Sequence, residues 1–103
     1  MFWTKVFATK YEIVVALCDE ELLDKEIDFK KTNTKIKISK NFYGEHLVDE
    51  NVVLKLLTSA TIGNLFGKEI VDLAITHGFI SDENIINIDG IPHAQFAKLE
   101  EKR

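Results

Sequence analysis

The sequence predicts an α+β domain, in which β-hairpins form an antiparallel sheet, a helical hairpin packs on that sheet, and a C-terminal β-hairpin completes it. Three observations support this prediction. The first 40 residues contain four short segments that are rich in β-branched residues or alternate between apolar and polar residues. Residues 49–77 carry apolar side chains at helical spacing. An Asp-Gly turn signal at 89–90 separates two further apolar segments.

Length and composition indicate one folded domain over residues 1–103. Hydrophobic residues make up 46% of the chain, which is enough for a core. No apolar run approaches the about 18 residues that span a bilayer, and the first 21 residues lack the pattern of a signal peptide. We therefore expect a cytoplasmic protein without a membrane partner. The single cysteine, Cys18, excludes an internal disulfide, and its place in an apolar strand predicts a buried, inert thiol.

The distribution of charge limits how the protein can contact nucleic acid. The net charge is −4. Residues 46–103 account for all of this excess negative charge, with five basic and nine acidic side chains. Proteins that bind nucleic acid through their overall charge are basic. Any such contact here is expected to be local, or to share its interface with protein.

The N-terminal third predicts two strands followed by an acidic connection. Residues 2–8 and 11–17 form an expected antiparallel hairpin. Three consecutive acids then open the acidic segment 19–26, and they suggest either a metal or acid/base site or a solvated connector: Asp19, Glu20 and Glu21. Adjacent carboxylates do not converge on one point, so the connector is favoured and no metal or other cofactor is expected.

A second hairpin is predicted from residues 26–30 and 35–40, and it carries a basic patch. From residue 30 to residue 40 the chain has no acid and five lysines: Lys30, Lys31, Lys35, Lys37 and Lys40. The patch suits contact with RNA phosphates, and it equally suits an edge strand that lysines protect from aggregation. Phe42 and Tyr43 follow in a predicted loop, 41–48, where they can stack on bases beside the lysines or, as is more common for such residues, fill the gap between sheet and helices.

Two helices are expected next, with a glycine-marked corner between them. Asp49 is the expected N-cap of the first helix, and residues 68–77 form the second, which Gly78 ends. The corner contains Gly63, Asn64 and Gly67. Their amides, with the following helix N-terminus, suggest an anion site. The favoured alternative is that the glycines let the helices turn and pack, because the pattern matches neither a Walker loop nor a dinucleotide fingerprint.

The C-terminal segment predicts a hairpin and a second polar group. Residues 85–88 and 91–99 are the expected strands, and residues 100–103 a polar tail. His93 and Gln95 share one face of the last strand, where a hydrogen-bonding site is conceivable. A histidine at the rim that holds a turn is the favoured alternative. No carboxylate or nucleophile lies beside His93 at a spacing that indicates a catalytic group, so no catalytic activity is expected.

The ordered set ALCDEELL (16–23), FYGEHLVDE (42–50), ATIGNLFG (60–67), VDLAITHGFI (71–80) and GIPHAQ (90–95) resembles the small archaeal family DUF424 over essentially the whole chain. The resemblance implies a single-domain protein, described as predicted RNA-binding, with a suspected tie to translation. It supplies no catalytic residues. It marks six positions as parts of the family pattern: Gly63, Asn64, Gly67, Pro92, His93 and Gln95. The lysine-rich hairpin lies outside that pattern.

Three hypotheses for function follow. The first is a non-catalytic accessory protein of the archaeal translation apparatus, bound to ribosomal RNA and to ribosomal proteins or translation factors. The second is a small enzyme or ligand-binding domain with an anion site at the Gly63–Gly67 corner and His93 nearby. The third is a protein-binding module, for example a homodimer through a strand edge, although a monomer is favoured.

Overall fold

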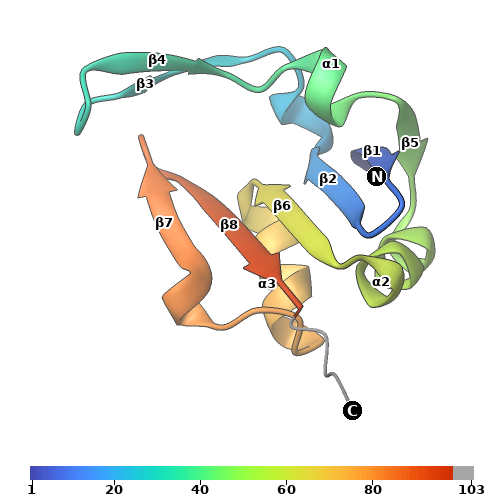
Figure 1. The fold of residues 1–103 in the computed structure, drawn as a ribbon. Coiled ribbons are helices and arrows are strands. Elements are labelled where there is room, and N and C mark those ends of the chain that lie inside the picture. Colours follow the sequence, from blue (N-terminus) through green and yellow to red (C-terminus); the bar gives the residue numbers. More distant parts are fainter. Residues whose placement is uncertain (99–103) are drawn as a thin grey trace.

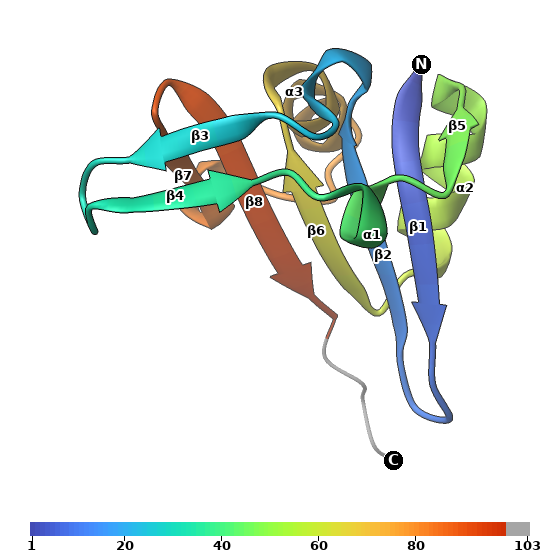
Figure 2. The ribbon, with the colours of Figure 1, turned by 90° about the horizontal axis from the view of Figure 1, so that it is seen from above.

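The computed structural model describes residues 1–98, which form a twisted six-stranded sheet with two helices on one face, and a short helix and a two-stranded β-arm on the other (Figures 1 and 2). The elements in chain order are β1 (Phe2–Ala8), β2 (Ile13–Asp19), the 3-10 turn η1 (Glu20–Leu22), β3 (Glu26–Phe29), β4 (Thr34–Lys37), α1 (Lys40–Tyr43), β5 (His46–Val48), α2 (Glu50–Ser59), β6 (Ile62–Phe66), α3 (Lys68–Thr76), the 3-10 turn η2 (Asp82–Asn84), β7 (Ile85–Ile88) and β8 (Ile91–Ala97).

The large sheet has the strand order β5-β1-β2-β6-β8-β7. Strands β2 and β6 are parallel, and every other neighbouring pair in this sheet is antiparallel. The predicted hairpins β1–β2, β3–β4 and β7–β8 are all present. The α+β class and the largely antiparallel sheet are therefore confirmed.

Alternation along the strands gives the sheet two different faces. Val15, Leu17 and Leu65 point to the face that α2 and α3 cover, here called the helix face, and they are fully buried. Ala16 and Cys18 point to the opposite face, here called the arm face, which α1 and the β3–β4 hairpin cover in part. Side chains one residue apart on a strand therefore enter different clusters.

Both predicted helices form, and local signals explain their ends. The Asp49 carboxylate caps α2 by accepting from the Val52 amide at 3.0 Å. Helix α3 buries Ile70, Val71 and Ala74 against the sheet. Gly78 then adopts φ +77°, the left-handed conformation that ends the helix at little cost for glycine.

The predicted helical hairpin is wrong, because the corner between the helices is a central strand. Residues 62–66 form β6, which pairs with β2 on one side and β8 on the other. Gly63 does not mark a turn. It makes room for the Phe96 ring of β8, since a Cβ on Gly63 would lie 2.1 Å from Phe96 Cε2. Glycine weakens a strand in isolation, and here a close approach between neighbouring strands requires it.

Of two smaller predictions, one differs from the structure and the other extends beyond the described residues. The predicted loop 41–48 contains the short helix α1, capped by the Ser39 side chain, and the edge strand β5. The final strand ends at Ala97, so the predicted strand residue 99 and the tail 100–103 lie outside the described residues. Within residues 1–98, no helix has the length and apolar character needed to cross a membrane.

Candidate functional site

A network of three polar side chains lies on the arm face and joins three segments of the chain. The Tyr43 hydroxyl, at the end of α1, donates a hydrogen bond to Asn64 Oδ1 on β6. His93 Nε2 on β8 lies 3.1 Å from the same oxygen. The rings pack around this point, with Phe66 edge-on to both Tyr43 and His93. Asn64 therefore fixes α1 and β8 to the middle of the sheet.

The protonation of His93 follows from its partner. Burial lowers the pKa of the His93 imidazole below its ordinary value of 6.5, so the ring is neutral at pH 7. A neutral imidazole has one N–H, and Asn64 Oδ1 can only accept. With the Asn64 amide oriented by the Tyr43 hydroxyl, the proton is assigned to Nε2, and Nδ1 remains as an acceptor.

The network leaves hydrogen-bonding capacity unused. Among residues 1–98, the Asn64 Nδ2 amide and the Gln95 side chain make no hydrogen bond, and no buried side-chain nitrogen or oxygen lacks a partner. The Asn64 NH2 group therefore reaches solvent. Gln95 is exposed and stands opposite Asn64 in the β6–β8 register, on the same face. Two amide groups lie side by side on the surface of the sheet.

The anion site predicted at Gly67 is already filled by a group of the protein itself. Gly67 precedes α3 with φ +125°, and the Asp19 carboxylate lies so close that a Cβ there would be 2.3 Å from Asp19 Cγ. Asp19 accepts from the amides of Glu69 at 3.0 Å and Ile70 at 2.8 Å. The free α3 amides that an external anion would need are thus bonded to an internal carboxylate. With Gly63 buried under Phe96, the anion-binding prediction is wrong for both glycines.

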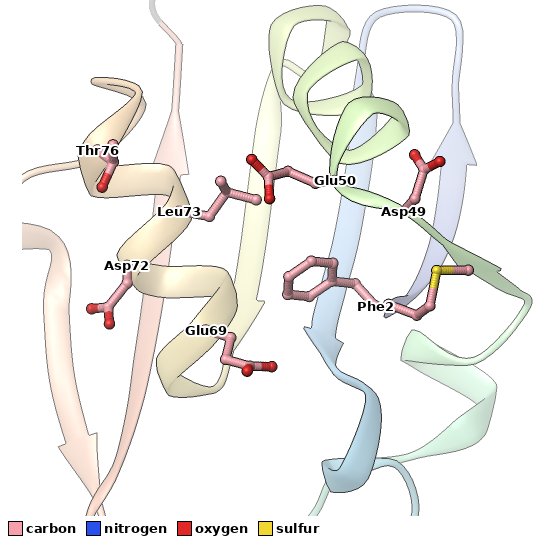
Figure 3. A pocket seen from close by; sticks show the side chains of 8 residues that line it. Phe2, Asp49, Glu50, Glu69, Asp72, Leu73 and Thr76 are labelled. Atoms are coloured by element: carbon pink, nitrogen blue, oxygen red, sulfur yellow. The ribbon is translucent and has the colours of Figure 1, made fainter.

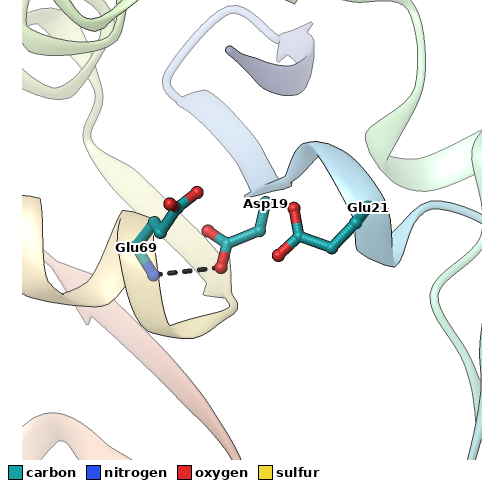
Figure 4. A group of neighbouring side chains, drawn as sticks. All are labelled: Asp19, Glu21 and Glu69. Carbon is teal, nitrogen blue, oxygen red and sulfur yellow. Dashed lines mark hydrogen bonds between the residues drawn. The ribbon is translucent and has the colours of Figure 1, made fainter.

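Asp19 also corrects the idea of a solvated acidic connector. It is 2% exposed, and burial raises the pKa of its carboxyl above the ordinary 3.8, although the two amide hydrogen bonds act in the opposite direction. Carboxylate oxygens of Asp19, Glu21 and Glu69 lie within 4.8 Å of one another (Figure 4). Glu69 comes from α3, about 50 residues further along the chain, so no local pattern in the sequence predicts that it joins this group. The cap on α3 accounts for Asp19, and the other two carboxylates are exposed.

Cys18 is a buried free thiol, as the sequence predicts. Burial, and to a smaller extent the nearby Asp19 and Glu21 carboxylates, raise the pKa of this thiol to about 12. A thiol with such a pKa is almost entirely protonated at pH 7. Cys18 is therefore inert as a nucleophile in the folded protein.

A second acidic region lies on the helix side, between the start of β1 and the helices α2 and α3. It is a hollow of about 480 Å³, and Figure 3 shows Phe2 and Leu73 at its floor with acidic side chains around them. Its four acids are Asp49, Glu50, Glu69 and Asp72. Two of these have structural roles, because Asp49 caps α2 and Asp72 pairs with Lys68 at 2.7 Å.

The predicted lysine patch forms an arm that stands away from the body. The arm (residues 24–40) crosses the sheet over β7, and its tip extends beyond the sheet in both Figure 1 and Figure 2. Ile27 and Phe29 turn inward and join the cluster that contains Ile88 and Ile91. The five predicted lysines are exposed: Lys30, Lys31, Lys35, Lys37 and Lys40.

Acidic residues on β3 moderate part of this patch. In the arm register Lys37 faces Glu26 and Lys35 faces Asp28. Lys35 Nζ lies 3.6 Å from Glu26 Oε1, and among the described residues it is the one lysine of the five in an ion pair. Lys30 and Lys31, in the turn between the strands, have no acid opposite them. The strongest positive charge is therefore at the tip.

Tyr43 does not belong with the lysines as a base-stacking group. Its ring is 5% exposed and packs edge-on between Phe42 and Phe66, so it fills the space between α1 and the sheet. The neighbouring Phe42 is the aromatic that reaches the surface, at 37% exposure. The structure thus brings Tyr43, Asn64, His93 and Gln95 together and leaves the arm lysines apart from them.

Comparison with known proteins gives the fold and a family, without an assigned activity. The model of the family described as "Protein of unknown function (DUF424)" matches residues 7–99. Among proteins with curated descriptions, none matches the chain. An uncharacterised conserved protein from Methanopyrus kandleri, known from a crystal structure, is 23% identical and superposes with a TM-score of 0.78, covering 99% of this chain and 96% of that one.

Proposed function

The chain belongs to the DUF424 family of proteins of unknown function, and we propose that it is a non-catalytic accessory protein of the translation apparatus that binds RNA through the tip of the β3–β4 arm. One observation carries this proposal, the separation of charge between arm and body. Residues 24–40 hold six basic and three acidic side chains, a net charge of +3. The remainder of the chain holds seven basic and fourteen acidic side chains, a net charge of −7.

The shape of the arm suits contact with a polyanion. An RNA phosphate approaching the acidic body is repelled, whereas at the projecting tip it meets Lys30 and Lys31 at a distance from most of the carboxylates. The inner face of the arm packs on β7 and β8, so its lysines are held outward by an apolar anchor. Lysine carries charge without reading bases, so this contact positions the protein on RNA.

The acidic body suits a protein partner within the same particle. Glu50 and Glu69 line the hollow between the helices and pair with no cation among residues 1–98. A basic protein surface is the complementary chemistry, and ribosomal proteins or translation factors provide it. A protein with one basic and one acidic end is suited to a site where RNA and protein meet.

Sedimentation of the tagged full-length protein from its native lysate, through sucrose gradients at low and high salt, tests the proposal. We expect migration with a ribosomal subunit at low salt and release at high salt, since phosphate contacts weaken with ionic strength. Lys30→Glu combined with Lys31→Glu is expected to move the protein to the top of the low-salt gradient. A protein that stays at the top in both gradients would contradict stable ribosome association.

A matched control separates a local contact from an overall charge effect. Lys55 is exposed on α2, away from the arm. Lys31→Glu and Lys55→Glu change the net charge equally, and neither lysine forms an ion pair among the described residues. The arm variant is expected to lose association and the helix variant to keep it. Equal losses would exclude the arm as the contact.

A further inference from the structure

The uncovered part of the arm face has features that the lysine contact does not use. Two neighbouring rows of side chains cross the sheet from β1 to β8 on this face. The strand register aligns Lys5, Ala16, Asn64 and Gln95 in one row, and Phe7, Val14, Ile62 and Ala97 in the next. Helix α1 lies over the β1 and β2 end of these rows. At the β6 and β8 end, Asn64 and Ile62 are partly exposed and Gln95 is exposed.

An aromatic surface borders the rows. Phe42 of α1 stacks on Phe7 with ring centroids 5.4 Å apart and an interplanar angle of 27°. Lys5 Nζ lies 5.1 Å from the Phe7 centroid and donates to the Asn41 carbonyl at 2.9 Å, which holds α1 in place. Phe42 keeps 37% of its surface exposed. Part of a phenyl ring that Phe7 supports from below is therefore open to solvent.

The same face of the sheet carries two side-chain amides with unused donors, Asn64 on β6 and Gln95 on β8. The Asn64 carbonyl is held by Tyr43 and His93, so its NH2 group is oriented outward by the protein. Gln95 lies next to it across the strand pair. A ring for stacking together with fixed side-chain amides is the chemistry that recognises unpaired bases, because stacking uses the base face and an amide uses its edge.

We propose that this surface, formed by Phe42, Asn64 and Gln95, binds the bases of single-stranded RNA. The inference rests on the proposed function, since Lys37 and Lys40 at the base of the arm lead from the tip toward this surface. In a duplex the faces of the bases are stacked on one another and the Watson–Crick edges are paired. The surface therefore selects single strands, and phosphates of the same strand that lie toward the arm can reach its lysines.

Fluorescence anisotropy with a labelled single-stranded RNA oligonucleotide of mixed sequence, and with the same strand annealed to its complement, tests this inference. The full chain is expected to bind the single strand at least about tenfold more tightly than the duplex at equal salt. Phe42→Leu is expected to weaken single-strand binding about five- to thirtyfold through lost stacking. Gln95→Ala is expected to weaken it about two- to tenfold through a lost hydrogen bond, and both variants are expected to leave duplex binding unchanged. Melting temperature, measured in parallel, confirms that each variant folds.

Two control variants match these changes away from the surface. Tyr11→Leu removes an aromatic ring that is 79% exposed in the β1–β2 turn, and Asn51→Ala removes an exposed amide on α2. Both are expected to bind the single strand as the wild type does. If they weaken binding as much as Phe42→Leu and Gln95→Ala, the proposed surface is wrong.

The outcomes separate this inference from the proposed function. One outcome would overturn the inference and keep the arm contact. In it, RNA binding depends on Lys30 and Lys31, is equal for single strand and duplex, and is unaffected by Phe42→Leu and Gln95→Ala. No binding of either RNA would overturn both. Single-strand binding of undiminished affinity in the Lys30→Glu, Lys31→Glu variant would support the surface and contradict the arm.

Discussion

On each face of the sheet a polar side chain joins segments that are distant in sequence, and Asp19 on the helix face and Asn64 on the arm face differ in what they leave free. On the helix face, both oxygens of Asp19 accept from backbone amides of α3, about 50 residues away in sequence. On the arm face, Asn64 accepts from Tyr43 and His93 through one oxygen and keeps its NH2 group for solvent. The Asp19 contact engages both carboxylate oxygens within the protein and serves stability, whereas the Asn64 network keeps an NH2 group open and can serve binding.

Burial affects the charged Asp19 carboxylate and the neutral groups of the arm-face network differently. Asp19 is an ionisable group 2% exposed, so it must be fully bonded, and burial still raises its pKa. The arm-face network consists of groups that are neutral at pH 7, because burial also lowers the pKa of His93 and raises that of Tyr43. Neutral amides can remain partly unbonded at a surface at small cost, which a buried carboxylate cannot.

Gly67→Ala is expected to cause the largest effect, because it breaks the helix-face contact. The residue has φ +125°, and a methyl group would meet the Asp19 carboxylate. Backbone strain and loss of the cap together are expected to lower the free energy of unfolding by about 3 kcal/mol, measured by urea denaturation.

Gly78→Ala is the matched control. It has φ +77°, but no atom lies within 4 Å of the added Cβ, so it tests strain alone. We expect a loss of about 1 kcal/mol. Equal losses of unfolding free energy for the two variants would show that backbone strain alone requires glycine at 67, without a contribution from the Asp19 contact.

Tyr43→Phe is expected to have a smaller effect, on the arm face. It removes one hydrogen bond to Asn64 Oδ1, while His93 still reaches that oxygen. The free energy of unfolding should fall by about 1 kcal/mol. Tyr11→Phe, at an exposed tyrosine, should change it by less than about 0.5 kcal/mol. If Tyr43→Phe lowers the free energy of unfolding as much as Gly67→Ala does, the arm-face network stabilises the fold as strongly as the Asp19 contact.

The smallest expected effect concerns the pH dependence of stability. The folded pKa of His93 lies below 6.5, so the unfolded chain binds the proton more readily. The contribution of His93 is present in full above pH 6.5 and is lost as the pH falls from 6.5 toward the folded pKa. Between pH 7.5 and 5, the melting temperature of the wild type should therefore fall further than that of His93→Gln. The same fall in both would contradict the lowered pKa.

Most elements of the fold follow from local signals. The alternation in residues 2–8, the Asp49 cap, the Gly78 stop and the Asp89-Gly90 turn each gave the element that the structure contains. These signals act between residues close in sequence, so they can be read without the fold. The burial of Cys18 was predictable in the same way, from the apolar strand around it.

Strand β6 was not predictable from the sequence, because what stabilises it lies elsewhere in the chain. Its five residues include a glycine, stand between two helices, and are too few for a periodic pattern. Their hydrogen bonds come from β2 and β8, and the missing Cβ of Gly63 is explained by the Phe96 ring. In isolation the Gly63-Asn64 pair has the composition of a turn.

The candidate site also has features that the sequence predicts and features that only the tertiary structure decides. The sequence established which residues are unusual for a core, including Asn64, His93, Gln95 and the run of lysines at 30–40. Tertiary structure decided that Asn64 and His93 bond to each other, that Tyr43 is buried while Phe42 is exposed, and that Asp19 fills the α3 terminus. Residue type fixes what a side chain can donate or accept, whereas pairing between distant strands fixes which of those groups remain free.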